Sequence, residues 1–184
     1  MRTRRRAGAS ELLRAPRALA NVDVHIAHKR GCLAKEGDNL EARILSPGDE
    51  ELLAAAAAIC EEDNDPGPAR CRQLLADPCF VAAVALDGGQ PVGLAYGHVL
   101  LQISRTALLI YSVDTDGGHR RQGAATAMID ALRRLSIERG YYEMWVLTSA
   151  TNALAMRLYA SCGGVRETCD DVMWVFPLES SSAA

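Results

Sequence analysis

A run of glycine, arginine and small residues, DGGHRRQGAA at residues 116–125, could bind an anion. It lies between a predicted strand and a predicted amphipathic helix, where free backbone N–H groups and the helix dipole attract negative charge. Gly123 lets the backbone approach a ligand closely, and the small Ala125 keeps side-chain bulk away from it. Arg120 and Arg121 add charged hydrogen-bond donors. The run therefore predicts a pyrophosphate site, with a solvated surface loop as the alternative reading.

The same loop resembles a known coenzyme-binding signature. Arg120, Gly123 and Ala125 resemble the Arg/Gln-x-x-Gly-x-Gly/Ala signature of the GNAT N-acetyltransferase superfamily, in the strand-to-helix position that this family requires. A second block resembles the family's Asn-x-x-Ala-x-x-x-Tyr-x-x-x-Gly helix through Asn152, Ala155, Tyr159 and Gly163. The resemblance extends over residues 40–178 and implies acetyl-CoA as the donor substrate.

The resemblance implies roles for individual residues. It places the coenzyme against Val113, Thr115, Arg120, Arg121, Gln122, Gly123, Ala124, Ala125, Thr126, Asn152 and Tyr159. It also implies that Tyr159 is the general acid, because its phenol can protonate the departing thiolate. The alternative for Tyr159 is a core tyrosine whose hydroxyl is satisfied by a hydrogen bond.

Within the superfamily, the chain resembles the type I aminoglycoside 3-N-acetyltransferases. The likeness rests on Ile110 and Tyr111, on His119–Gly123, on Ala125 and Thr126 with the helix Ala127–Leu132, and on Val172 and Met173. It implies acetyl transfer to the 3-amino group of a deoxystreptamine antibiotic such as gentamicin. One position departs from the subfamily, since Ser112 stands where an aspartate is expected after the strand tyrosine.

The acceptor side needs a base, because an amine attacks only in its neutral form. Asp114 lies two residues after Ser112 on the same predicted strand face, displaced by about 6.6 Å, and can replace the missing acid. We assign the base role to Asp114 and the oxyanion donor to the backbone N–H of Val113. Further acceptor contacts are predicted for Tyr111, Ser112, Glu62, Asp63, Asp170 and Asp171, although charged loops are usually only solvated.

Apolar periodicity and turn signals predict the elements that position these residues. Strands are expected at Leu40–Ile44, Phe80–Leu86, Val92–Ile103, Ala107–Thr115, Tyr141–Leu147 and within Val165–Leu178. Helices are expected from Pro47, with Ser46 as N-cap, to about Glu61, and at Arg70–Ala76, Gly123–Arg139 and Asn152–Ser161. Hairpins combined with a crossover helix predict an α+β fold, whose mixed, mostly antiparallel twisted sheet is flanked by helices.

Composition and charge narrow the class of protein. The chain has 184 residues, of which 49% are hydrophobic and 23% charged, as is typical of one globular domain. Residues 1–39 hold nine Lys+Arg and four Asp+Glu without apolar periodicity, which predicts a basic, poorly ordered extension. The domain at residues 40–184 holds eleven basic and nineteen acidic residues, net −8, which favours cationic partners over nucleic acid.

Other features bear on compartment, metal and assembly. No apolar run reaches the ~18 residues that span a bilayer, and arginines interrupt any signal-peptide core, so a cytoplasmic protein without membrane contact is expected. Six cysteines without CxxC spacing predict reduced thiols. His25, His28 and Cys32 form an HxxHxxxC string, but a fourth zinc ligand is not evident, so no metal is expected. A homodimer is a family expectation.

Three functions stay open from sequence. The leading prediction is an N-acetyltransferase that modifies an aminoglycoside by direct transfer from acetyl-CoA. The second keeps the fold and the coenzyme but uses a polyamine, an amino acid or a protein lysine as acceptor. The third is a non-catalytic acyl-CoA-binding regulator.

Overall fold

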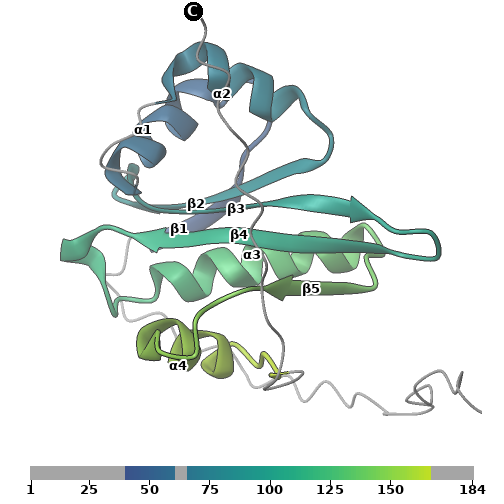
Figure 1. Cartoon of the computed structure of the whole chain (residues 1–184). Coiled ribbons are helices and arrows are strands. Elements are labelled where there is room, and N and C mark those ends of the chain that lie inside the picture. The colour runs from purple at the N-terminus through teal and green to yellow at the C-terminus, as the bar shows by residue number, and fades with distance from the viewer. Residues whose placement is uncertain (1–39, 61–65, 167–184) are drawn as a thin grey trace, which may run out of the picture. The chain divides into compact units, whose positions relative to one another are not determined.

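The computed structural model describes residues 40–60 and 66–166. Its helices and strands follow one another in the predicted order (Figure 1): β1 (Leu40–Ile44), α1 (Glu50–Cys60), α2 (Gly67–Ala76), β2 (Phe80–Asp87), β3 (Gln90–Leu101), β4 (Thr106–Thr115), α3 (Ala124–Glu138), β5 (Glu143–Val146) and α4 (Ala153–Ser161). One turn of 3₁₀ helix, η1 (Gly117–His119), lies between β4 and α3.

Among the described residues, five strands form one sheet in the order β1-β2-β3-β4-β5. The first four strands pair antiparallel, whereas β5 pairs parallel to β4 after the chain has crossed over through α3. Helices α1 and α2 cover one face of the sheet and α3 covers the other, with α4 beyond α3 (Figure 1). The α+β class and the mixed, mostly antiparallel sheet are therefore confirmed.

Strand β2 joins the two hydrophobic cores, because both of its faces are buried. The side chains that pack toward α3 are Val81, Ala83 and Ala85. The side chains that pack toward α1 and α2 are Ala82, Val84 and Leu86. This alternation with a period of two residues puts the middle of the sheet between two close-packed layers, which hold the neighbouring strands β3 and β4 in place.

Helix α1 begins later than the sequence predicted. Its cap is Asp49 and not Ser46, because the Asp49 carbonyl accepts the first helical hydrogen bond, from the Leu53 N–H at 2.9 Å. The prediction of a helix starting at Pro47 is wrong for a physical reason. Residues 46–49 form a turn instead, in which Gly48 has a φ of 107° that other residues rarely adopt.

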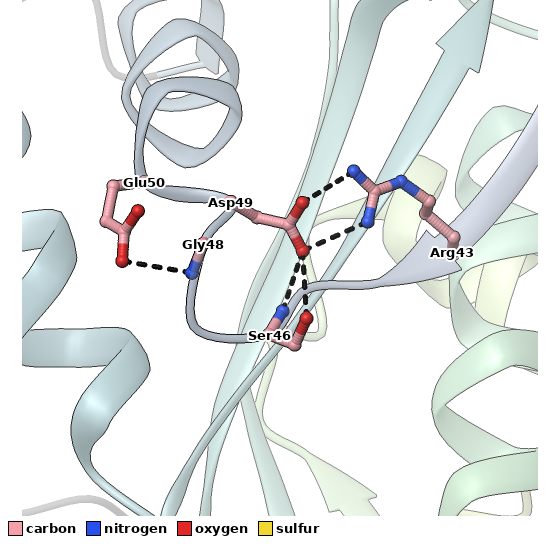
Figure 2. A network of polar contacts seen from close by, with 5 residues as sticks. All are labelled: Arg43, Ser46, Gly48, Asp49 and Glu50. Carbon is pink, nitrogen blue, oxygen red and sulfur yellow. Dashed lines mark hydrogen bonds and ion pairs between the residues drawn. The ribbon is translucent and has the colours of Figure 1, made fainter.

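The Asp49 carboxylate holds this turn together and joins it to β1 (Figure 2). It accepts hydrogen bonds from the Ser46 N–H at 2.9 Å and from both terminal nitrogens of Arg43 at 2.8 and 3.0 Å. The Arg43 hydrogen bonds lower the pKa of Asp49 to about 2, with further help from Ser46, and they outweigh the opposing effect of burial. The ionised form of Asp49 is therefore the one that stabilises the β1–α1 connection.

Other boundaries differ by a few residues. Helix α2 begins at Gly67 rather than Arg70, since a proline in its first turn has no N–H that would need a partner. The turn between β2 and β3 is a two-residue turn of Gly88 and Gly89, with φ of 56° and 82°, as tight hairpins require. The strand predicted within Val165–Leu178 lies, from residue 167 onward, outside the described residues.

Candidate active site

Strand β4 carries a β-bulge near its centre. Its register with β3 shifts between Tyr96, which pairs with Ser112, and Gly97, which pairs with Ile110. Tyr111 is therefore the extra residue of the bulge. A bulge bends its strand and re-aims side chains, and it occurs frequently beside functional sites.

A glycine makes this bulge possible. A Cβ atom at Gly97 would lie 2.0 Å from the Leu109 carbonyl oxygen, so the backbone of β4 approaches β3 more closely than any side chain allows. The sequence analysis did not single out Gly97. An isolated glycine inside a predicted strand is the signal that could have found it.

The bulge also marks the point where β4 separates from β5. Pairing of the two strands ends at Ile110, which faces Val146, so residues 112–115 have no partner on β5. Val113 lies in this stretch, which pairs with β3 alone. The oxyanion role of the Val113 N–H and the coenzyme contact of Thr115 remain predictions.

Ser112 and Asp114 lie on the same face of β4, as the sequence predicted. The Ser112 hydroxyl donates a hydrogen bond to the Asp114 carboxylate. Ser112 pairs with Tyr96 of β3, and Asp114 pairs with Leu94 of the same strand. Tyr96 and Leu94 belong to the core on the α1–α2 side. The acceptor side of the site therefore has a carboxylate that is half-buried and held in place by its neighbour.

Tyr159, the predicted acid, lies on α4. Its side chain is half-buried and lines a cavity of 360 Å³ between α3, β5 and the end of α4. Burial raises the pKa of Tyr159, and the negative charge of Asp114 raises it further. The phenol is therefore protonated at neutral pH. The carboxylate on β4 therefore lies near enough to the phenol on α4 to favour its protonated form.

Both ends of α4 are capped. The Asn152 side chain accepts a hydrogen bond from the Ala155 N–H at 3.1 Å, so Asn152 is the N-cap. At the other end Gly163 has a φ of 82°, and the Gly164 N–H donates to the Tyr159 carbonyl at 2.8 Å. A Cβ at Gly164 would lie 2.9 Å from that oxygen. The glycine pair therefore fixes the backbone of Tyr159, in addition to ending the helix.

The predicted anion loop reaches the first turn of α3. Arg121 has a φ of 63°, unusual for a residue with a side chain, and Gly123, the N-cap, has a φ of 97°. No side chain caps this helix. The N–H groups of Ala124, Ala125 and Thr126 consequently lack intrahelical acceptors and are available to an anion.

The side chains around this turn suit a phosphate ligand. Arg120 and Arg121 are exposed beside it, and Ala125 presents only a methyl group. The Gln122 side chain donates to the Gly118 carbonyl at 3.0 Å, which fixes the loop. A strained backbone, free donors and two arginines fit a pyrophosphate with no change of fold.

His119 ties the loop to the β2–β3 hairpin. Its Nδ1 lies 2.7 Å from the Asp116 carboxylate and its Nε2 3.6 Å from that of Asp87. The hydrogen bond with His119 lowers the pKa of Asp116, and the Gly118 N–H adds to the shift. The sequence analysis gave His119 no role of its own, because its partner Asp87 is remote in the chain.

Several predicted residues are not placed by the structure. Glu62, Asp63, Asp170 and Asp171 lie outside the described residues, as do the histidines and cysteine of the HxxHxxxC string. In the part of the chain that is described, no three His, Cys, Asp or Glu side chains gather as metal ligands. Within the same residues, no helix is both long and apolar enough to cross a membrane.

A clasp between α3 and α4 was also not foreseen. The Arg133 guanidinium donates hydrogen bonds to the Cys162 carbonyl and, at 2.7 Å, to Asp130. It therefore joins the helix that begins at the anion loop to the end of the helix that carries Tyr159. Arginine on an exposed helix face gives no sequence signal for such a contact, because charged helix positions are usually only solvated.

Comparisons with known proteins agree with this arrangement. The sequence model of the Acetyltransferase (GNAT) family matches residues 50–164. An L-2,4-diaminobutyric acid acetyltransferase of Streptomyces coelicolor is 36% identical over 93 residues, which are 50% of this chain and 52% of that protein. The chain thus spans about half the length of this curated relative.

Solved structures share the fold. The aminoglycoside acetyltransferase HMB0005, from an uncultured soil metagenomic sample, is 30% identical with a TM-score of 0.69, over 76% of this chain and 98% of that chain. The aminoglycoside acetyltransferase meta-AAC0020, also from an uncultured soil metagenomic sample and solved with sisomicin, is 21% identical with a TM-score of 0.70, over 77% of this chain and 97% of that one. The second likeness concerns the fold alone.

Proposed function

We propose, from the premise that this chain belongs to the Acetyltransferase (GNAT) family, that it acetylates an aminoglycoside antibiotic, at the 3-amino group. The chain is an N-acetyltransferase, and the donor substrate of its family is acetyl-CoA. The proposal concerns the acceptor, the position acetylated and the residues that act.

The coenzyme supplies an activated acetyl thioester when it is bound. The first turn of α3, with Arg120 and Arg121, would hold its pyrophosphate, because that turn offers free N–H groups beside two guanidinium groups. The part of β4 beyond its pairing with β5 would contact the pantetheine arm through the backbone of Val113 and Thr115. Asn152 supports this side as the cap of α4.

Asp114 and Tyr159 are the proposed base and acid. Asp114 takes a proton from the acceptor's ammonium group, and the Val113 N–H stabilises the oxyanion that develops. Tyr159 gives its phenolic proton to the sulfur that leaves. The observation that carries the proposal is the Asp114 carboxylate, which the Ser112 hydroxyl holds on β4 beyond the point where pairing with β5 ends. Direct transfer requires a base beside the attacking amine and an acid beside the leaving sulfur, and α4 supplies Tyr159 for the second role.

The comparisons support an aminoglycoside as acceptor without deciding it. HMB0005 is named an aminoglycoside acetyltransferase, and this chain covers 98% of it at 30% identity. An amino acid that carries a second amine is the other acceptor favoured by an observation, since the Streptomyces coelicolor relative is named for L-2,4-diaminobutyric acid. Both acceptors are multiply charged amines, which suits the carboxylate of Asp114.

Release of coenzyme A from acetyl-CoA, followed with a thiol reagent, tests the proposal. The full chain is assayed with kanamycin, gentamicin, L-2,4-diaminobutyrate and spermidine, and the product of the best acceptor is located by NMR. Release with kanamycin or gentamicin, together with acetylation at the 3-amino group, is the expected result. Release only with diaminobutyrate or spermidine would show that the acceptor is that amine and not an aminoglycoside. No release with any amine, despite acetyl-CoA binding, would indicate a non-catalytic acyl-CoA-binding regulator.

A further inference from the structure

The bulge in β4 gives Tyr111 an unusual orientation. In a regular strand, neighbouring side chains point to opposite faces, so Tyr111 and Ser112 would be on different sides of the sheet. Here two residues of β4 oppose the single residue Tyr96. The Tyr111 ring lies against the Tyr96 ring, with 5.8 Å between centroids, and Ser112 pairs with the same residue. Consecutive side chains of β4 therefore share the acceptor face.

Tyr111 is also the exposed end of an aromatic row. The ring of Tyr96 contacts that of Phe80, with 6.0 Å between centroids, and both belong to the edge of the core on the α1–α2 side. Tyr111 itself keeps 71% of its surface exposed. Its neighbour fixes one side of the ring, which leaves the rest open to a ligand. Packing in the core gives no reason for a large aromatic residue at this place.

The Tyr111 ring and the Asp114 carboxylate together favour an acceptor with a second positive charge. An aromatic ring attracts a cation to its face, and the Asp114 carboxylate attracts one beside it. Tyr111 and Asp114 are three residues apart on β4, a separation of about 10 Å or less along the strand. The reacting amine at Asp114 would thus have a neighbouring ammonium group of the same acceptor within reach of the Tyr111 ring.

We infer that Tyr111 is a specificity-determining residue, whose ring binds a second ammonium group of the acceptor next to the amine that reacts at Asp114. This inference rests on the proposed function, since it needs an amine acceptor at Asp114. The inference goes beyond the proposed function because it assigns the recognition of acceptors with several amines to the bulge in β4.

Two substitutions at Tyr111 distinguish the effect of an aromatic ring from the effect of a large apolar side chain. Tyr111→Phe keeps the aromatic face, whereas Tyr111→Leu keeps a large apolar side chain without it. The substrate is whichever of kanamycin, gentamicin, L-2,4-diaminobutyrate and spermidine gives the highest kcat/KM, because each carries several amines. The matched control is Tyr142→Leu, since Tyr142 is 66% exposed, lies just before β5 and packs on Arg105.

The leucine variant is expected to lower kcat/KM for the acceptor by about 3- to 10-fold, mainly through KM, as loss of a cation–π contact implies. The phenylalanine variant and Tyr142→Leu are expected to stay within about twofold of the unaltered chain. The KM for acetyl-CoA should be the same in all four proteins, which shows that the fold and the coenzyme site are intact.

An equal loss in Tyr111→Phe and Tyr111→Leu would overturn the inference, because the hydroxyl and not the ring would then matter. An unchanged kcat/KM in Tyr111→Leu would overturn it as well. Either result leaves acetyl transfer to an amine standing, since turnover of the amine is then observed. A failure of the proposed function is recognised separately, in the unaltered chain, as no coenzyme A release with kanamycin or gentamicin.

Discussion

Replacing Asp49 by asparagine is expected to lower the free energy of unfolding by about 2 kcal/mol at pH 7. The pKa of Asp49 is about 2 in the folded chain against an ordinary value of 3.8, a difference of about 1.8 units. Each unit corresponds to about 1.36 kcal/mol, so the upper bound is about 2.4 kcal/mol. The Arg43 side chain is 44% exposed, and water screens its part of the interaction, which reduces the value somewhat.

The dependence on pH has a definite sign. Because the pKa of Asp49 is lower in the folded chain than in the unfolded one, its ionised form stabilises the fold at pH values above 3.8. This stabilisation is lost as the pH falls toward 2. The difference between the unaltered chain and Asp49→Asn should therefore be about 1 kcal/mol smaller at pH 3 than at pH 7.

Urea unfolding followed by circular dichroism measures this difference at both pH values. Glu51→Gln is the matched control, since Glu51 is an exposed carboxylate on the first turn of the same helix, and its effect should be below about 0.5 kcal/mol. A loss below about 0.5 kcal/mol in Asp49→Asn at pH 7 would refute the reasoning. So would a loss of the same size at pH 3 and pH 7.

Three further substitutions test the site. Gly97→Ala should cost about 1–3 kcal/mol in urea unfolding and lower kcat/KM more than about tenfold, because the bulge must shift; unaltered kinetics would contradict this. His119→Ala should raise the KM for acetyl-CoA about fivefold at constant kcat, as loss of one hydrogen bond that positions the loop implies. Tyr159→Phe should lower kcat about 10- to 100-fold at unchanged acetyl-CoA affinity, and an unchanged kcat would remove its acid role.

The fold could be predicted from the sequence because local patterns determine most of it. Alternating apolar residues and glycine-rich turns predicted the strands, and the helix boundaries differ from the prediction where side chains or a proline set the first turn. At the start of α1, Ser46 has the chemistry of a helix cap, but Asp49 holds the cap position. The choice depends on Arg43, which comes from the preceding strand, and no pattern within the helix itself contains that information.

The anion loop could be predicted from the sequence as well, since its glycine and arginine residues lie together in the chain. The backbone of Arg121 and Gly123 has the unusual φ values of 63° and 97° that such a loop needs. The placement of Asp114 beside Ser112 followed from the period of two residues in a strand. Their hydrogen bond confirms that placement, although the base role of Asp114 stays a prediction.

The parts that could not be predicted depend on contacts between distant segments. The bulge at Tyr111 exists because β3 supplies Gly97 at the opposite position, and a strand pattern alone shows no register. His119 reaches Asp87, and Arg133 reaches the end of α4, through pairings that only the folded chain creates. These contacts position the loop and the helix of Tyr159 without adding a recognisable motif.

Binding of acetyl-CoA to Ala125→Asp, measured by isothermal titration calorimetry, tests the central claim most directly. An aspartate in the first turn of α3 suits the helix dipole, so thermal stability should be equal or higher. The same charge repels a pyrophosphate, and the affinity should fall at least about tenfold, whereas Ala125→Ser should bind as the unaltered chain does. Unchanged affinity in a folded Ala125→Asp protein would contradict the assignment of this turn as the coenzyme site.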